Sequence, residues 1–195
     1  MSDTAESQTA SGAAKVAIIV GTTRPGRKAE TVARWVQEIA ARRDSATFDV
    51  VDIADFDLPH LDEPAPARSG QYTRPHTKAW SEKIGAYDAY VFVTPEYNGS
   101  IPGVLKTAVD FLGAEWGGKP TAYVSYGWNA GRGAAGHLRD VLSVLGVRHV
   151  EAAVELAFKD DFEEATTFRP AEQQEKNVLL LVDELLAKAA EPVSE

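Results

Sequence analysis

Residues Val16-Ala17-Ile18-Ile19-Val20 run straight into Gly21 and set the architecture of this 195-residue chain. Five consecutive apolar residues, mostly β-branched, are typical of a parallel strand covered by helices on both faces. After the glycine the pattern changes to helical spacing, with apolar residues at Val32, Trp35, Val36 and Ile39. A buried strand followed by an amphipathic helix predicts the first half of a β-α-β unit.

The same alternation continues along the chain. Further strands are expected at 48–53, 89–93, 121–125 and 147–154, and acids within 48–53 make that strand an outer one. Helices are expected at 74–87, 104–112, 134–145 and 172–189, with a proline-bearing loop at 55–69. Five strands alternating with five helices predict an α/β fold: a flavodoxin-like, doubly wound five-stranded parallel sheet of order 2-1-3-4-5, with helices on both faces.

Length and composition fit one domain. Hydrophobic residues make up 44% and charged residues 25% of the chain, which is an ordinary globular balance. We expect a single domain over residues 15–190, a disordered N-terminal tail at 1–14 and a short C-terminal tail at 191–195.

Charge and cysteine content exclude several functions. The formal net charge of -9 disfavours binding to nucleic acid, and no apolar run is long enough to span a bilayer. A chain without cysteine has no thiolate metal site or thiol redox chemistry, so any electrons must travel through a cofactor. The four histidines show no metal-ligand spacing, and no metal site is expected. A cytoplasmic protein is the default expectation.

The segment from Gly21 to Arg27 connects the first strand to its helix. A helix N-terminus offers free N–H groups and a favourable dipole to an anion. Thr22 and Thr23 add hydroxyl donors, and Arg24 and Arg27 add charges suited to a phosphate dianion. Because the P-loop and G-x-G-x-x-G patterns are both missing, the segment is either a phosphate loop of another kind or a surface turn with solvated arginines.

Two more unusual loops follow the third and fourth strands. The prolines of residues 94–103 stiffen a loop that could present main-chain groups to a flavin edge, or simply let Asn98 and Ser100 cap the next helix. The glycines and aromatics of residues 125–133 would let a planar ring lie against the backbone, or leave Trp128 as an interface residue. Ligands of such sheets bind at the carboxyl ends of the strands, so the three loops predict one site.

These motifs resemble the NADPH-dependent FMN reductase family, which includes azobenzene, quinone and chromate reductases. The most specific segment runs from Pro95 to Pro102 and on into Leu105-Lys106, and the resemblance covers roughly residues 15–154. It implies non-covalent FMN as cofactor and NADPH or NADH as co-substrate. Hydride would pass from NAD(P)H through FMN to a small acceptor, either a flavin, a quinone, an azo compound or a metal oxyanion, without a catalytic side chain.

The resemblance also implies a set of cofactor-binding residues. The FMN phosphate would be held by Thr22, Arg24 and Arg27. The ring would be bordered, largely by main-chain groups, by Pro95, Glu96, Tyr97 and Asn98 on one side and by Ser125 and Gly127 on the other. Trp128 is added to the cofactor-binding residues because of its position in the latter loop. Family members are commonly homodimers and sometimes dimer pairs, that is homotetramers. The helix with Lys106 and Asp110 would then belong to the interface.

Two residues depart from the family pattern, and the roles of Glu96 and of an acidic run need separate interpretation. Trp128 stands where the family often has a smaller residue, and we expect it to pack near the ring or the acceptor. Thr107 replaces a frequent asparagine. Glu96 is interpreted as an acceptor that stabilises its loop rather than as a proton donor. The acidic run 160–164 is expected to be a solvated connection, with a lid over the site as the alternative.

Two other functions compete with the reductase. A flavodoxin-type electron carrier would have the same fold without its own NAD(P)H oxidation, although arginines are unusual in the phosphate loop of such carriers. A regulatory protein would retain the fold and lack the flavin.

Overall fold

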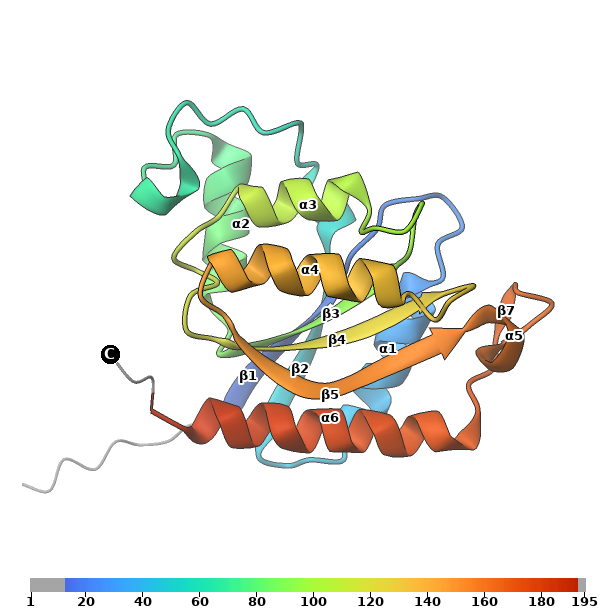
Figure 1. The fold of residues 1–195 in the computed structure, drawn as a ribbon. Helices are drawn as coiled ribbons and strands as arrows, with labels where there is room; N and C mark the ends of the chain where they lie inside the picture. Colours follow the sequence, from blue (N-terminus) through green and yellow to red (C-terminus); the bar gives the residue numbers. More distant parts are fainter. Residues whose placement is uncertain (1–12, 193–195) are drawn as a thin grey trace, which may run out of the picture.

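The computed structural model describes residues 13–192 and is built on a parallel sheet of order β2-β1-β3-β4-β5 (Figure 1). Its strands are β1 (Ala14–Val20), β2 (Ala46–Asp52), β3 (Ala89–Pro95), β4 (Pro120–Gly127) and β5 (Arg148–Ala157). Helices α1 (Ala29–Ala40) and α6 (Glu172–Ala190) cover one face. Helices α2 (Pro75–Gly85), α3 (Gly103–Asp110) and α4 (Arg132–Val144) cover the other. The predicted fold class and strand order are confirmed.

Most of the two predicted tails lies outside the described residues, at 1–12 and 193–195. Strand β1 already begins at Ala14, inside the segment expected to be tail. Ile53, expected at the end of an outer strand, instead starts the short 3-10 helix η1 (Ile53–Phe56). The proline-bearing loop after it contains a second such turn, η2 (Ala67–Ser69).

The two faces of the sheet bury separate hydrophobic cores. Side chains alternate along β1, so that Val16, Ile18 and Val20 pack in the core under α1 and α6. Ala17 and Ile19 point the other way, into the core under α2, α3 and α4. All five residues are fully buried, which accounts for the uninterrupted apolar run.

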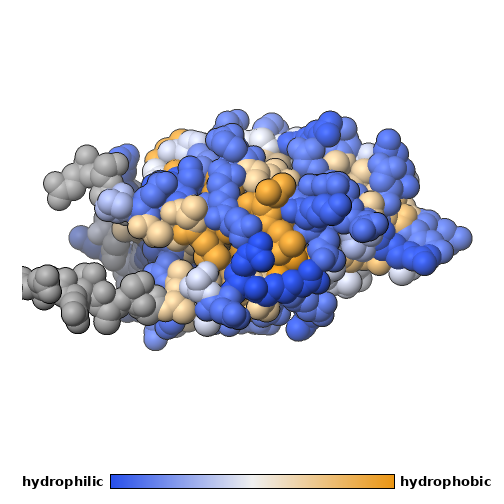
Figure 2. Space-filling model, turned by 90° about the horizontal axis from the view of Figure 1, so that it is seen from below, coloured by the Kyte–Doolittle hydropathy of each residue, from blue (hydrophilic) through white to orange (hydrophobic). Residues whose placement is uncertain are grey.

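The outer surface of the α1–α6 layer is mostly hydrophilic, with a hydrophobic patch near its middle (Figure 2). Ion pairs tie the segment after α1 to α6: Arg42 contacts Glu175 at 2.5 Å and Arg43 contacts Asp183 at 2.6 Å. Exposed pairs of this kind each contribute about 0–1 kcal/mol.

The long loop before α2 is fixed by one carboxylate. Glu63 accepts hydrogen bonds from the main-chain N–H of Thr73 at 3.0 Å and of Arg74 at 2.8 Å, at the start of the helix. These bonds outweigh partial burial and lower the pKa of Glu63 to about 2. The loop is therefore anchored close to α2 at neutral pH.

Strand register brings every carboxyl end to one edge of the sheet. Val20 pairs with Asp52 in β2 and with Val93 in β3, and Gly127 pairs with Ala157 in β5. The loops after β1, β3 and β4 consequently emerge side by side, together with the segment that follows β5.

The segment after β5 corrects one prediction. It forms α5 (Phe158–Asp161) and a small hairpin, β6 (Phe162–Glu163) with β7 (Thr167–Phe168). The expectation of a solvated connection is wrong for Asp161 and Phe162, which are 1% and 5% exposed. Phe162 packs on the rings of Phe158 and Phe168. Asp161 accepts main-chain hydrogen bonds from Ala157 at 2.9 Å and Ala171 at 3.0 Å, so it joins both ends of the excursion.

A polar chain at the β4–β5 side of the sheet fixes the state of a histidine. The Ser143 hydroxyl donates to the carbonyl oxygen of Arg139 at 2.7 Å, so the His149 Nε2–H donates to Ser143 at 2.8 Å. His149 Nδ1 then accepts from the Tyr123 hydroxyl at 2.6 Å. This pattern requires a neutral ring, and burial followed by the charge of Arg139 lowers the pKa of His149 below 6.5.

Stability should therefore fall in mild acid. A histidine whose pKa is lower in the folded state stabilises the fold above pH about 6.5, and this contribution is lost as the pH falls through the lowered pKa. We expect the wild-type protein to lose more unfolding free energy than His149→Gln between about pH 7.5 and pH 5.5, measured by urea unfolding. Carboxylates titrate alike in both proteins, so equal losses would contradict the assignment.

Candidate functional site

The first loop leaves the sheet through a tight contact with β3. The Gly21 N–H donates to the Val93 carbonyl at 2.8 Å, and a Cβ on Gly21 would lie 2.9 Å from that same oxygen. Thr22 is buried next to it, and its hydroxyl lies 2.9 Å from the hydroxyl of Tyr97. The Arg24 guanidinium lies 5.9 Å from the centre of the Tyr97 ring. Residues predicted to bind phosphate and residues predicted to border the ring are thus in contact.

Arg27 is held by β2. Its guanidinium forms an ion pair with Asp52 at 2.5 Å, and this hydrogen bond is the main cause that raises its pKa. Its Nε atom is buried and has no hydrogen-bond partner among residues 13–192. A buried donor without a partner is costly, so this N–H is available to an incoming acceptor.

The second loop ends in a tight turn. Asn98 and Gly99 have φ angles of 52° and 77°, and Tyr97 and Ser100 exchange main-chain hydrogen bonds of 2.8 and 3.1 Å across them. Both left-handed positions favour an Asn-Gly pair. The alternative that Asn98 and Ser100 cap α3 is wrong, because that helix has no side-chain cap and the Ser100 hydroxyl contacts His137 instead.

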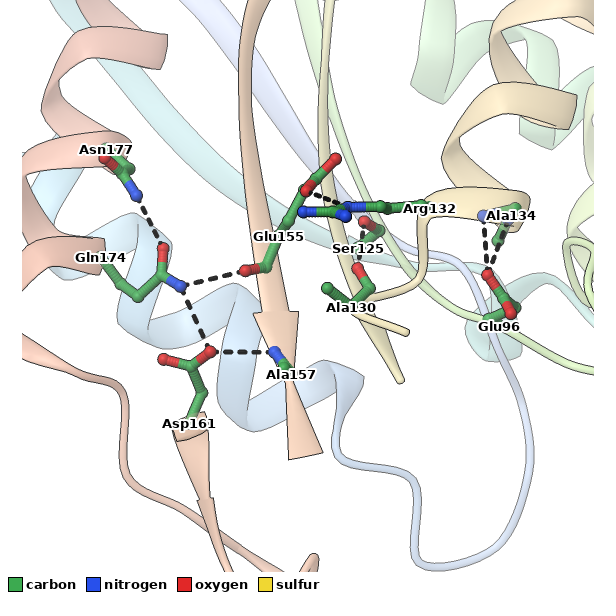
Figure 3. A network of polar contacts seen from close by, with 11 residues as sticks. Glu96, Ser125, Ala130, Arg132, Ala134, Glu155, Ala157, Asp161, Gln174 and Asn177 are labelled. Atoms are coloured by element: carbon green, nitrogen blue, oxygen red, sulfur yellow. Dashed lines mark hydrogen bonds and ion pairs between the residues drawn. The ribbon is translucent and has the colours of Figure 1, made fainter. Parts of the chain in front are cut away.

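Glu96 links the second loop to α4. Its carboxylate accepts from the N–H groups of Gly133 at 2.7 Å and Ala134 at 3.3 Å, in the first turn of that helix (Figure 3). A negative charge at a helix N-terminus is favourable. The interpretation of Glu96 as a stabilising acceptor is confirmed.

The third loop, after β4, makes a sharp turn that is closed by a hydrogen bond. The Ser125 hydroxyl donates to the Ala130 carbonyl at 2.8 Å, as Figure 3 shows. Gly131 has a φ of 73°, and a Cβ there would lie 2.6 Å from the Tyr126 nitrogen. The loop folds back on β4 so closely that only glycine fits.

The three loops and the segment after β5 enclose a cavity of about 420 Å³. Six predicted residues line it: Arg24, Arg27, Pro95, Glu96, Tyr97 and Trp128. The four others, Thr22, Asn98, Ser125 and Gly127, lie beside it rather than on its walls. The side chains of Thr22 and Ser125 are buried and already hydrogen-bonded, so they support the loops.

Sequence reasoning missed several lining residues, among them Lys28, Tyr126, Phe158 and Ala165. Phe158 packs edge-on against Trp128, with ring centres 5.4 Å apart, while the indole remains 76% exposed. A signal for this wall existed: Phe158, Phe162 and Phe168 interrupt a stretch otherwise rich in acids. The cavity is therefore lined both by cations of the first loop and by aromatic rings.

The fold and the position of this cavity define an α/β protein of the flavodoxin-like class. Residues 14–161 match the family described as NADPH-dependent FMN reductase. A NAD(P)H-dependent FMN reductase of Schizosaccharomyces pombe is 43% identical over 136 residues, which is 69% of this chain and 68% of that protein. A quinone reductase of Pseudomonas putida is 38% identical over 115 residues, or 56% of this chain and 58% of that protein.

Solved structures agree on the fold. FerB of Paracoccus denitrificans, described as a flavoenzyme NAD(P)H:(acceptor) oxidoreductase, superposes with a TM-score of 0.69 at 22% identity, covering 90% of this chain and 98% of its own.

The chain belongs to the NADPH-dependent FMN reductase family. It is a flavin-dependent NAD(P)H reductase, and the predicted family, enzyme class and FMN cofactor are confirmed. The electron carrier and the regulatory protein are correspondingly disfavoured.

Proposed function

We propose that the 420 Å³ cavity binds FMN non-covalently. The bound FMN would pass electrons from NAD(P)H to a small acceptor, with a flavin or a quinone as the preferred acceptor. The observation that carries this proposal is the mixed lining of the cavity. The cations Arg24, Arg27 and Lys28 line it together with the aromatic rings of Tyr97 and Trp128. A ligand that combines a phosphate with a planar ring matches that lining.

The residues present fit the cofactor. The unpaired Nε–H of Arg27 offers one donor to a phosphate oxygen, and α1 begins beside it without a side-chain cap. Arg24 adds a second guanidinium, and the buried Thr22 holds their loop against Tyr97. The backbone of Pro95–Asn98 and of Ser125–Gly127 would hold the ring edge.

Bound FMN supplies the two-electron chemistry that no side chain of this chain can supply. The protein contributes a shaped cavity, whose loops are held by the Glu96 cap and the Thr22–Tyr97 contact. Because the Glu96 carboxylate already accepts hydrogen bonds from the first turn of α4, we assign it no role as a general acid or base.

We further propose that two copies associate through α3 and α4. Hollows of about 340 and 460 Å³ lie between these helices and share Lys106 and Val141. Val144 lines the first of them and is 87% exposed. Lys106 pairs with Asp110 at 2.6 Å within one helix, so a twofold-related copy would meet both signs of charge. A homotetramer would add a second, different interface.

A cytoplasmic site of action is proposed because the reaction draws on NAD(P)H, which is regenerated inside cells. Among residues 13–192, no helix combines the length and hydropathy needed to cross a bilayer.

Flavin spectra test the activity. Protein mixed with FMN and desalted should keep the flavin absorption bands, and anaerobic NADPH or NADH should bleach them. Retained bands that resist both donors would favour an electron carrier, and loss of all flavin on desalting would contradict FMN binding by the cavity.

Arg24 tests the phosphate end. Arg24→Ala should weaken FMN binding by about 1.5–3 kcal/mol, the scale of a hydrogen bond to a charged group, as measured by quenching of flavin fluorescence. Arg34→Ala, on the outer side of α1, is the control and should leave the affinity unchanged. Equal affinities of the wild-type protein and Arg24→Ala would remove Arg24 from the site.

Val144 tests the dimer. The wild-type protein should sediment at twice the 21.0 kDa chain mass, and Val144→Glu should shift it towards the monomer because a carboxylate would be buried in the interface. Leu180→Glu is matched, since Leu180 is 62% exposed on α6 at the opposite face. A monomeric wild-type protein, or dissociation by both variants, would argue against this interface.

A further inference from the structure

A second cavity, of about 310 Å³, opens beside the first. Trp128 lines both cavities. Tyr97 and Phe158 line the first with it, and Asn129, Arg132 and Glu155 line the second with it. A single extended ligand could therefore pass from one to the other along the exposed indole.

The floor of the second cavity is rigid. The Gln174 amide donates to the Glu155 carbonyl at 3.0 Å and to the Asp161 carboxylate at 3.2 Å, and it accepts from Asn177 at 2.9 Å (Figure 3). Asp161 is itself held by the main chain of Ala157 and Ala171. All these groups are satisfied, so they shape the cavity rather than bind a ligand.

The rim, in contrast, has groups that remain available. Arg132 reaches from the start of α4 to Glu155 and uses only its Nε on that carboxylate, at 2.7 Å (Figure 3). Its side chain is 64% exposed, and that of Lys159 is 73% exposed with a single loose contact to Asp160 at 3.7 Å. Two cations thus line the cavity together with the exposed Trp128 and the carboxylates of Glu155 and Asp160.

An indole face suits a planar base, and neighbouring cations suit a diphosphate. We propose that the second cavity binds the adenosine diphosphate half of NAD(P)H, with the adenine against Trp128 and the diphosphate near Arg132 and Lys159. This inference rests on the proposed function, because the nicotinamide half must reach the first cavity at the same time. The carboxylates of Glu155 and Asp160 at the rim are then acceptors for ribose hydroxyls.

A donor that lacks the adenosine diphosphate half isolates this contact. With FMN-loaded protein, the double variant Arg132→Gln/Lys159→Gln should lower kcat/KM for NADPH and NADH by about 10-fold, on the scale of one charge-assisted hydrogen bond. The value for 1-benzyl-1,4-dihydronicotinamide should stay within about 2-fold of the wild type, since that donor has no phosphate to bind. Arg34→Gln is the matched control, because Arg34 is 63% exposed and also paired with a glutamate.

Binding of ADP gives a readout that does not depend on turnover. Calorimetry should detect ADP binding to the FMN-loaded wild-type protein, and the double variant should weaken it by a similar factor while the dissociation constant of FMN stays unchanged. Equal losses for the full and the truncated donor, no loss for either, or no ADP binding by the wild type would overturn the inference. If the wild type oxidises neither donor, the proposed function fails, and ADP binding alone then decides whether the cavity takes a nucleotide.

Discussion

Val20 ends β1 with a partner on each side, Asp52 in β2 and Val93 in β3, and the site depends on this in-register pairing. A slip of one residue would turn Val16, Ile18 and Val20 from one core into the other. It would also separate Gly21 from the Val93 carbonyl, through which the first loop leaves the sheet. The register therefore both satisfies two hydrophobic cores and brings the carboxyl-end loops together, so stability and site geometry share one cause.

At the carboxyl edge of this sheet, a few polar contacts join the neighbouring loops into one cavity wall. The Glu96 carboxylate caps α4, the main-chain N–H of Glu96 donates to the Tyr126 carbonyl at 3.0 Å, and the Tyr97 hydroxyl contacts the Thr22 hydroxyl. The second loop is thus bonded to both of the others. Charge at the phosphate end is likewise organised in advance, because Asp52 orients Arg27 while leaving its Nε free. The lining residues Glu96, Tyr97 and Arg27 are thus held in place by contacts outside the cavity, so the cavity is preformed.

Sequence reasoning predicted what depends on local pattern. The alternation of five apolar runs with five stretches of helical spacing predicted the strand order, and the glycines and prolines after β1, β3 and β4 marked the loops at the site. The rest depended on contacts between distant residues. The burial of Asp161 is stabilised by main-chain donors at Ala157 and Ala171, which an acidic stretch does not reveal. Phe158 reaches the cavity only because that excursion folds back, and the Glu96 cap joins residues 37 positions apart.

The excursion from Phe158 to Phe168 is closed at both ends by the single side chain of Asp161, and its own hairpin pairs only within itself. Phe162 packs in the core under α1 and α6, and Phe168 packs on Trp35, so these rings must be kept. The turn of the hairpin at residues 164–166 has no such role, and evolution or a protein engineer can exchange it while keeping the sheet intact. Ala165 in this turn lines the cavity together with Phe158, so such exchanges offer this scaffold a route to new acceptors without a loss of fold.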